Sequence, residues 1–460
     1  MPRPNLLYVF ADQMRSSDMG CVGNPDVLTP NLDRFASESC LFESAYANCP
    51  VCTPSRGVLL TGRYPFSTGV LANDLPLSPE IPGIGKAYKS AGYRTGYIGK
   101  WHLDGVPRAR FTPPGPRRHG FDYWAVWNCA HRYFGGQYYT DSPEPITIEG
   151  YEPAGQTDLA IEFMERKDDR PFCLFLSWGP PHDPYTKVPP GFREKYNLDI
   201  LSLRGNVQPI KKLRGDGAEA LGPAECLAYY YAAITALDEQ FGRLLAKLDE
   251  LGLAENTIVV FTSDHGDMLW SQGMLKKQQP WEESAGIPFV VRWPGKIPEG
   301  ARPDVLLSTI DFVPTLLSLC EVPGLPEMHG SDLSEVFLGR SREGPEAVYL
   351  MDVVTVDEAG GQGLHEWRGV RTKSHTYAEW VDGGSWLLYD NVADPLQLTN
   401  LASAPRHLAE RERLEGMLGR LKRDFEDPCL PWREMVRRHG LVDLWNERER
   451  ELHPKDPRLL

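Results

Sequence analysis

The sequence lacks the long apolar runs and the basic excess that define two large classes of protein. No apolar run is long enough to cross a bilayer, so we expect no membrane partner. Lys and Arg number 49 against 63 Asp and Glu, for a formal net charge of -14. This balance argues against nucleic acid as a partner, because phosphate backbones are bound by clustered Lys and Arg. A small anionic substrate stays compatible with it, because such a molecule responds to the local field of its pocket.

Cysteine is present without the spacing of a disulfide framework. The nine cysteines are odd in number and scattered, which is typical of a reducing compartment. Cys49 and Cys52 alone form a CPVC sequence, which has the spacing of a redox motif. No long apolar leader precedes the first strand-like run, so we expect cytoplasmic residence. A chain trimmed of a leader would look the same, which leaves a periplasmic or secreted location open.

Short apolar runs bounded by turn residues recur along the chain and are typical of strands buried on both faces. They occupy residues 5–11, 95–99, 171–178, 257–263 and 288–293. Helical patterns alternate with them at residues 32–38, 84–91, 156–166 and about 224–251. This alternation predicts a doubly wound α/β fold, a large sheet flanked by helices, with functional groups at the carboxyl ends of its strands.

The pattern changes beyond about residue 340. Short strand-like runs occupy residues 348–354, 369–380 and 385–390, and a helical pattern follows at about 406–425. We therefore predict a large α/β domain over residues 1–340 and a smaller antiparallel sheet with one packed helix over residues 341–460. The charged segment at 432–460 is a candidate surface arm or oligomer contact.

Two predicted strands are followed by residues that ligate hard cations. Asp12 and Gln13 follow the first strand, and Asp264 and His265 follow the strand at 257–263. Each acid alone is typical of a turn or a helix cap. Together, two carboxylates, an amide oxygen and an imidazole fit one divalent cation, and the oxygen-rich set favours Ca²⁺ or Mg²⁺ over zinc.

The segment VCTPSRGVLLTGRYP, residues 51–65, combines a thiol with two guanidinium groups. A thiol at a helix start beside Arg56 should have a lowered pKa, because the helix dipole and the cation both favour the thiolate. Cys52 is then a reactive nucleophile, and a partner such as His102 or His182 would make it a cysteine hydrolase. The alternative is a small buried core residue, as free cysteines commonly are.

Three further segments supply cationic and titratable side chains. Lys100 and His102 alternate along GKWH, so an extended backbone would point both to one face. His182 lies in the proline-bracketed loop WGPPHDPY, and Lys276 and Lys277 precede an aromatic residue and two acids. Taken singly, such residues are usually solvated surface groups, so their combination matters more than any one of them.

The ordered set of motifs resembles the type I sulfatase family of the alkaline phosphatase superfamily, and it covers nearly the whole chain. The signature is Cys52-x-Pro-Ser-Arg followed by LTGR at residues 60–63. The supporting motifs are PNLLYVFADQ at 4–13, TPNLDRFA at 29–36, GKWH at 99–102, GFDYW at 120–124, SDHGD at 263–267 and LYDNVADPLQLTNLA at 388–402. The resemblance implies an alkaline phosphatase-like mixed sheet.

The resemblance also implies a modified nucleophile. In proteins similar to this one, a separate maturation enzyme reads the CxPxR motif and oxidises its cysteine, here Cys52, to Cα-formylglycine. One hydroxyl of the hydrated aldehyde attacks sulfur, and the other later expels sulfate by collapse to the aldehyde. One divalent cation, Ca²⁺ by expectation with Mg²⁺ or Mn²⁺ as alternatives, would be held by Asp12, Gln13, Asp264, His265 and the modified Cys52.

Catalytic roles follow from the same resemblance. Arg56 would hold the nucleophile, and Lys100 and Lys277 would clamp sulfate oxygens. His102 would deprotonate the remaining hydroxyl, and His182, shared with Lys277, would protonate the leaving alcohol. Of two adjacent lysines, Lys277 stands at the family spacing before the aromatic-Glu-Glu segment.

One departure from the family pattern leaves the reaction class open. Gln13 stands where many family members carry an acid. A site with Gln13 and His265 resembles a subset of the family that includes carbohydrate sulfatases and phosphonate monoester hydrolases. The leading hypothesis is a sulfuric ester hydrolase acting on a sulfated sugar, with the aromatic stretch at 127–141 as a sugar platform, a lid or core. The alternatives are a phosphonate monoester or phosphodiester hydrolase, and a non-catalytic binding protein with decayed motifs.

Overall fold

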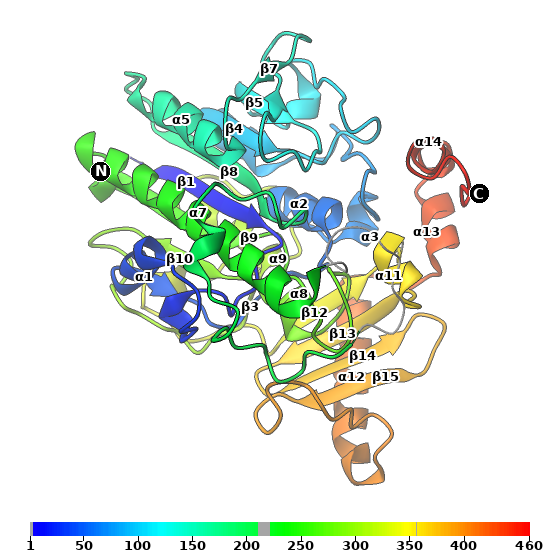
Figure 1. The fold of residues 1–460 in the computed structure, drawn as a ribbon. Helices are drawn as coiled ribbons and strands as arrows, with labels where there is room; N and C mark the ends of the chain where they lie inside the picture. Colours follow the sequence, from blue (N-terminus) through cyan, green and yellow to red (C-terminus); the bar gives the residue numbers. More distant parts are fainter. Residues whose placement is uncertain (1–2, 210–220, 356) are drawn as a thin grey trace.

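A seven-stranded mixed sheet forms the centre of the larger, N-terminal part of the chain (Figure 1). The computed structural model describes residues 3–209, 221–355 and 357–460. From edge to edge the strands are β2 (Cys40–Leu41), β10 (Phe289–Arg292), β9 (Thr257–Ser263), β1 (Asn5–Asp12), β8 (Phe172–Pro181), β4 (Arg94–Lys100) and β5 (Tyr123–Trp127). The strands from β9 to β5 run parallel, whereas β10 pairs antiparallel with β9 and β2. The predicted large mixed sheet is confirmed.

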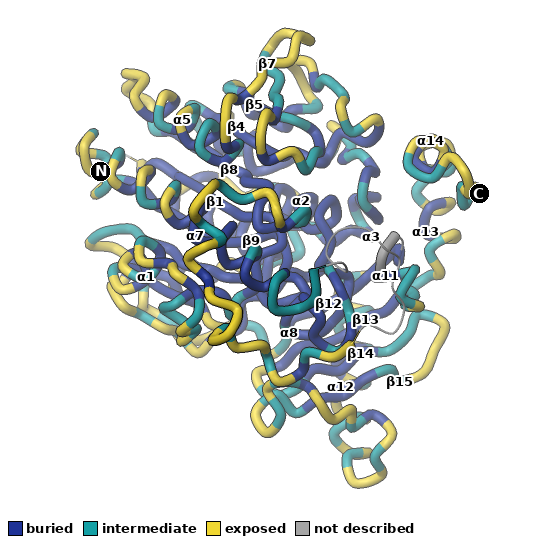
Figure 2. Tube along the Cα trace, viewed as in Figure 1, coloured by how far each residue is buried: buried dark blue, intermediate teal, exposed yellow. Residues whose placement is uncertain are grey.

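Helices cover both faces of this sheet, because successive side chains of a strand point to opposite faces. In β1, Leu6, Tyr8 and Phe10 belong to one buried apolar cluster, and Leu7 and Val9 belong to the other. The first cluster is covered by α2 (Cys52–Thr61), α4 (Ile84–Ser90) and α9 (Thr309–Leu319), and the second by α1 (Pro30–Ser37), α5 (Glu152–Glu165) and α7 (Pro223–Glu250). Figure 2 shows the strands buried between these helices.

The carboxyl ends of the parallel strands meet at one edge of the sheet, where ligand sites form in doubly wound folds. β1 and β4 end at Asp12 and Lys100, and β9 and β8 end one residue before Asp264 and His182. Strands buried on both faces therefore deliver four predicted functional side chains to the same edge.

A second, four-stranded antiparallel sheet follows, as predicted. Its strands lie in chain order: β12 (Ala347–Asp352), β13 (Trp367–Thr372), β14 (His375–Trp380) and β15 (Ser385–Asp390). The predicted helix is α12 (Leu408–Asp424), whose Leu414, Met417 and Leu418 share a buried cluster with residues of this sheet. A domain boundary between residues 340 and 341 stays a prediction.

The charged tail packs on its own chain instead of projecting as an arm. It forms α13 (Trp432–Arg438) and α14 (Val442–Leu452), and the rings of Trp432 and Trp445 lie 4.6 Å apart. His439 Nε2 lies 2.9 Å from the carbonyl oxygen of Phe66, which follows α2. An oligomer contact through this tail stays a prediction.

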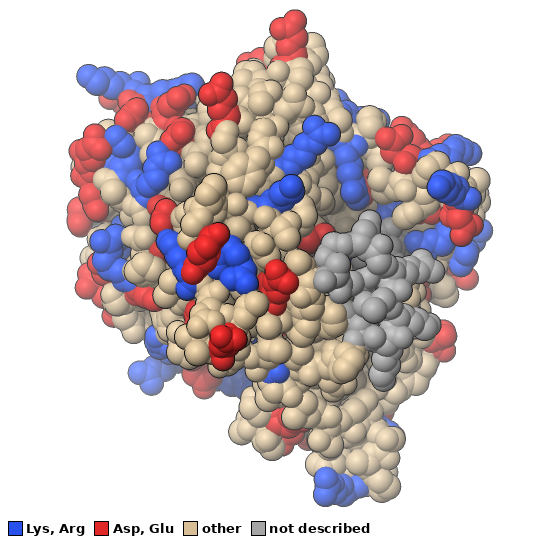
Figure 3. All heavy atoms as spheres, in the orientation of Figure 1, with Lys and Arg blue, Asp and Glu red and all other residues tan. Residues whose placement is uncertain are grey.

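The remaining elements are short. They are β3 (Ala45–Tyr46), α3 (Pro65–Thr68), β6 (Gln137–Tyr138), β7 (Ile146–Thr147), α8 (Glu282–Ala285), β11 (Leu307–Ser308), α10 (Ser334–Phe337) and α11 (Asp357–Gly361). Among the described residues, no helix combines the length and the apolar character needed to span a membrane. Acidic and basic side chains are interspersed on the face drawn in Figure 3.

Candidate active site

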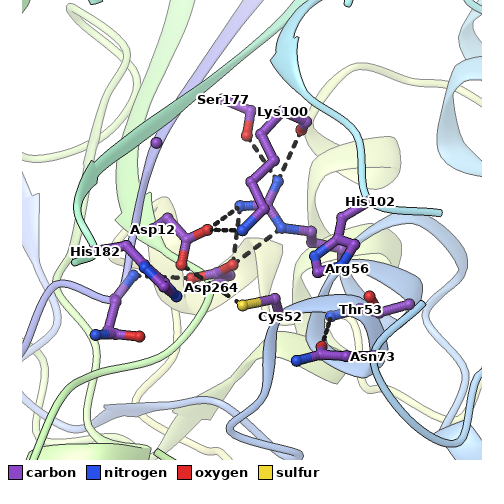
Figure 4. Close-up of polar contacts among 12 residues, drawn as sticks. Asp12, Cys52, Thr53, Arg56, Asn73, Lys100, His102, Ser177, His182 and Asp264 are labelled. Atoms are coloured by element: carbon purple, nitrogen blue, oxygen red, sulfur yellow. Dashed lines mark hydrogen bonds and ion pairs between the residues drawn. The ribbon is translucent and has the colours of Figure 1, made fainter. Parts of the chain in front are cut away.

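Four buried side chains from three elements converge at the sheet edge (Figure 4). Asp12, Cys52, Asp264 and His265 each place one ligand atom within 4.8 Å of the others. The Sγ atom of Cys52 lies 3.2 Å from His265 Nε2 and 3.7 Å from Asp12 Oδ1. Four of the five residues predicted to hold a cation are therefore brought together.

The chemistry of this cluster fits a bound divalent cation. Burial and the neighbouring charge of Asp12 raise the pKa of Asp264. Burial also opposes ionisation of Asp12, yet Lys100, His182 and Arg56 hold the pKa of Asp12 below its usual range. Two adjacent buried carboxylates repel each other unless a cation offsets their charge. Carboxylate oxygens and an imidazole supply such a site, and an oxygen in place of the Cys52 sulfur would make the set harder still.

Gln13, the fifth predicted ligand, lies beside the cluster with both ends of its amide engaged. Its Oε1 accepts a hydrogen bond from Lys277 Nζ at 2.6 Å, and its Nε2 donates to Asp267 Oδ2 at 2.6 Å. Tyr185 also donates to Asp267 Oδ2, at 2.5 Å. Sequence reasoning assigned no role to Asp267, although the SDHGD motif contains it. Its carboxylate orients the Gln13 amide.

Arg56 bridges the two carboxylates from the side opposite the thiol. Its Nε donates to Asp264 Oδ2 at 3.0 Å and its Nη2 to Asp12 Oδ2 at 3.2 Å. Its Nη1 donates to Ser177 Oγ at 2.7 Å and to the carbonyl oxygen of Lys100 at 2.8 Å. Burial lowers the pKa of Arg56, but Asp264 and Asp12 raise it above its usual range. The guanidinium therefore stays charged and fixed between the acids. Sequence reasoning missed Ser177, which no motif marks.

A second set of cations faces Cys52. Lys100 Nζ contacts Asp12 Oδ2, and Lys277 Nζ lies 2.6 Å from His182 Nε2. Burial raises the pKa of the Cys52 thiol, but Lys100, Lys277 and His265 lower it well below its usual value. The pocket of this acidic protein is therefore locally positive, as an anionic substrate requires.

His182 pairs with Lys277, and a backbone carbonyl group defines the tautomer of the His182 ring. His182 Nδ1 lies 2.8 Å from the carbonyl oxygen of Asp183, which only accepts hydrogen bonds. In a neutral ring the proton is then on Nδ1, and Nε2 accepts from Lys277 Nζ. Lys276, the less favoured of the two lysines, instead contacts Asp183 Oδ2 at 3.3 Å.

His102 is held by a partner that the motifs do not contain. Its Nε2 lies 3.0 Å from Asp74 Oδ1, and Arg108 grips both oxygens of Asp74 at 2.9 and 2.7 Å. Burial lowers the pKa of His102, but Cys129 and Asp74 raise it to about 10. Burial raises the pKa of Cys129, whereas His102 and Lys100 lower it to about 7. Only the tertiary fold joins Asp74 to His102, across 28 residues.

Local sequence explains why Cys52 opens a helix here. Val51 has an extended backbone, and Pro54 lies in the first turn, where amide groups have no partner within the helix. Gly62 ends α2 in the left-handed region at φ 64°, a conformation that side chains with a Cβ disfavour. Cys52 is the first helical residue, so its side chain lies at the positive end of the α2 dipole.

Several residues of the site hold a left-handed backbone without being glycine. The φ angles are 72° at Gln13, 65° at Asp74, 58° at His102, 63° at Lys276 and 76° at Gln278. Such conformations cost free energy and persist where surrounding contacts enforce them, commonly at functional sites.

The aromatic stretch at 127–141 is partly a support for His182. Tyr133 is buried and its hydroxyl donates to the carbonyl oxygen of His182 at 2.7 Å. The ring of His131 stacks on that of His182, with centroids 4.2 Å apart and planes 5° apart. Trp127 and Tyr139 stack on each other at 5.0 Å. A sugar platform on the rest of this stretch stays a prediction.

Two family models match this chain. A family model described as Sulfatase matches residues 4–322, more than half of the chain. The chain belongs to the sulfatase family. A second model, described as the C-terminal part of N-sulphoglucosamine sulphohydrolase, matches residues 271–424. This sulfatase is thus an enzyme that hydrolyses sulfate esters, and the resemblance read from its motifs is confirmed.

Relatives of this sulfatase align along most of their length. An ulvan-active sulfatase of Formosa agariphila is 38% identical over 431 residues, which are 92% of this chain and 82% of the relative. An endo-4-O-sulfatase of Bacteroides thetaiotaomicron is 32% identical over 484 residues, with 92% and 93% covered.

Two solved structures share the fold of this chain. One from a study of glycosaminoglycan metabolism by Bacteroides thetaiotaomicron has a TM-score of 0.82 and 30% identity, with 95% of this chain and 99% of that chain covered. The phosphonate monoester hydrolase of Agrobacterium radiobacter shares the fold at a TM-score of 0.76 and 22% identity, with 92% and 96% covered.

Proposed function

We propose that this sulfatase cleaves sulfate monoesters of carbohydrates, with modified Cys52 as nucleophile beside one divalent cation, Ca²⁺ by preference. The observation that carries the proposal is the convergence of Asp12, Asp264 and His265 on Cys52, opposite the ammonium groups of Lys100 and Lys277. The sugar substrate is supported by the names of the relatives, which act on ulvan or carry 4-O- and N-acetylglucosamine-6-O-sulfatase activities.

The residues that would hold the cation make the site suitable for an anionic substrate. Asp12, Asp264 and His265 would hold the cation, with Gln13 and the modified Cys52 completing the set. When bound, such a cation polarises the nucleophile and a sulfate oxygen. Arg56 favours the ionised form of both carboxylates and holds them in place, through bonds of 3.0 and 3.2 Å.

Lys100 and Lys277 are placed to bind the sulfate group. Both are buried ammonium groups that lower the pKa at position 52, so they lie within range of an anion on the nucleophile. Fixed donors in a pocket shielded from water stabilise charge strongly, because no solvent has to reorganise during the reaction.

His182 and Lys277 are placed to protonate the leaving alcohol. With its proton on Nδ1, His182 Nε2 accepts a hydrogen bond from Lys277 Nζ, so the ammonium group of Lys277 would carry the proton for the ester oxygen, and His182 would orient it. The stacked ring of His131 and the hydroxyl of Tyr133 hold His182 in this orientation.

In its neutral form, His102 is placed to take a proton from a hydroxyl at position 52, and its pKa of about 10 favours that uptake. Asp74 contacts its Nε2 at 3.0 Å and stabilises the imidazolium that proton uptake creates. The ring is buried, so water does not compete for the transfer.

Peptide mass and turnover together test the proposal. Protein made with a maturation enzyme should lose about 18 Da at Cys52, because CHO replaces CH2-SH. The Cys52→Ala variant should show neither the loss nor turnover. Matured protein should hydrolyse nitrophenyl sulfate and sulfated sugars faster than a nitrophenyl phosphonate. Absence of sulfate release from every aryl and sugar sulfate would refute the proposal, and a faster phosphonate would favour the second reaction class.

A further inference from the structure

Helix α14 reaches the back of the active site through one arginine. Arg448 is fully buried although α14 lies at the surface of the molecule, and its Nε donates to the carbonyl oxygen of Asn73 at 2.7 Å. Its Nη1 contacts Glu449, and its guanidinium lies 5.1 Å from the ring centroid of Trp445. Glu449 in turn accepts from the backbone amide of Arg458 at 2.9 Å. The guanidinium is therefore held by its own helix and aimed at Asn73.

Asn73, which Arg448 contacts, belongs to a turn that touches two parts of the site. Asn73 Oδ1 accepts from the backbone amide of Thr53, the residue after Cys52, at 3.0 Å (Figure 4). The amide of Asp74 donates to Thr53 Oγ1 at 3.2 Å, and Asp74 Oδ1 lies 3.0 Å from His102 Nε2. One turn thus fixes both the start of α2 and the imidazole.

This turn has a backbone that needs outside support. Asp74 lies in the left-handed region at φ 65°, which a residue with a Cβ adopts at a cost. A charged donor on the preceding carbonyl is stronger than a neutral one, and it fixes the orientation of the Asn73 peptide. Burying a guanidinium also costs desolvation, so an apolar residue at position 448 would be an easier choice for packing alone.

We propose that Arg448 is a positioning residue for the sulfatase reaction: it fixes the Asn73–Asp74 turn and, through it, Thr53 beside the nucleophile and the imidazole of His102. The inference rests on the proposed role of His102 as the base of the second chemical step. The C-terminal helices, which no catalytic motif contains, are then part of the catalytic apparatus.

The kinetic test compares Arg448→Met with Arg450→Met in matured protein. Arg450 is exposed on the same helix, so its substitution removes the same charge without touching the turn. We expect Arg448→Met to lower kcat for nitrophenyl sulfate by about ten- to a hundred-fold and to lower KM with it, because a slower second step leaves kcat/KM nearly unchanged. Because the base of the second step is displaced, nitrophenol should appear as a burst equal to the active enzyme, followed by slow turnover.

Two further variants separate positioning from a folding defect. Arg448→Lys keeps a charged donor near Asn73 and should recover part of kcat. If Arg448→Met does not fold, Arg448→Lys against Arg450→Lys carries the test, with a smaller loss expected at position 448. A normal kcat without a burst, or a loss shared by the position 450 variant, would overturn the proposal.

Hydrogen exchange gives a readout that does not depend on activity. In Arg448→Met, amides of residues 70–76 should exchange faster, while those of β1 keep wild-type protection. Unchanged protection at 70–76 would overturn the proposal even in an inactive preparation. Faster exchange at 70–76 together with a wild-type protein that releases no sulfate would refute the proposed function and leave the positioning contact supported.

Discussion

Two side chains, His102 and Arg108, place three nitrogen atoms on the buried carboxylate of Asp74. His102 Nε2 and Arg108 Nε share Oδ1 at 3.0 and 2.9 Å, and Arg108 Nη2 binds Oδ2 at 2.7 Å. Burial opposes ionisation of Asp74, but His102 and Arg108 hold its pKa well below the usual range. The carboxylate therefore stays charged and stabilises an imidazolium at His102.

We predict that Asp74→Asn lowers kcat by about a hundred-fold, because the amide removes the charge that stabilises protonated His102. The kcat/KM for nitrophenyl sulfate should change little, because it reports the steps up to nitrophenol release, whereas His102 acts in the second step. Steady-state kinetics measure both values. Asp122→Asn is the control, because Asp122 is exposed and its carboxylate pairs with Lys89 at the surface. Equal kcat in the two variants would show that the charge of Asp74 is dispensable.

The two adjacent lysines allow a paired substitution. Lys277 is buried against His182 Nε2 and Gln13 Oε1, whereas Lys276 is half-buried and contacts Asp183. We predict that Lys277→Ala lowers kcat/KM by at least about a hundred-fold, because it removes a sulfate donor and a proton source. Lys276→Ala should lower it by less than about threefold, as expected for a solvent-screened contact.

Substrates with different leaving groups give a second test of the Lys277→Ala prediction. In Lys277→Ala, alcohols of high pKa should lose more rate than nitrophenol, because they depend on protonation as they depart. The same loss for all leaving groups would mean that Lys277 binds sulfate but donates no proton.

Some residues of the site are marked by sequence motifs, whereas others are revealed only by the structure. Lys100 and His265 lie in short motifs at strand ends, and Cys52 lies in a motif at a helix start, so motifs in the sequence mark all three. Asp74 and Ser177 carry no such signal, because their roles come from hydrogen bonds to His102 and Arg56 across long stretches of chain. Partners of catalytic groups depend on tertiary packing, which spacing along one chain does not encode.

At the scale of elements, buried strands were the predictable part. The run at 5–11 became β1 (Asn5–Asp12), and the run at 257–263 has the bounds of β9. The single run predicted at 369–380 proved to be two strands, β13 and β14, joined at residues 373–374. The turn is formed by Lys373 and Ser374, with no glycine or proline to mark it, so only pairing in three dimensions reveals it.

The end of β12 carries a titratable group that makes stability depend on pH. Burial raises the pKa of Asp352 to about 7, with Thr355 Oγ1 donating to it at 2.6 Å. The folded pKa lies above the unfolded value, so the stabilisation is complete below about pH 4 and is lost as pH rises through about 7. The loss above that range is on the order of 4 kcal/mol.

We predict that the thermal midpoint of the wild-type protein falls between pH 5 and pH 8, and that Asp352→Asn flattens this fall. The amide keeps an acceptor for Thr355 and does not ionise. Unfolding scans at several pH values measure the slope, with the exposed Asp304→Asn as control. Parallel slopes in wild type and Asp352→Asn would assign the pH dependence to other groups.

At the scale of the whole molecule, an acidic protein with a formal net charge of -14 encloses a cationic pocket. The sheet supplies Asp12, Lys100 and Asp264 to the pocket, and α2 supplies Cys52. Helix α14 supplies Arg448, which contacts Asn73 beside Asp74. Segments separated by hundreds of residues therefore have to fold together before the site exists. Motif order predicted the first two contributions, whereas the packing of the tail came only from the structure.

A cation held by this site would link the stability of the protein to its activity. We predict that chelation lowers both the thermal midpoint and nitrophenyl sulfate turnover, because the buried pair Asp12 and Asp264 then loses part of the positive charge that offsets its repulsion. Restoring Ca²⁺ to 100 times its Kd should return about 2.7 kcal/mol. Parallel additions of Mg²⁺ and Mn²⁺ rank the ions by recovered midpoint. Asp264→Asn should show a smaller shift on chelation, and an equal shift in that variant would place the stabilising cation elsewhere.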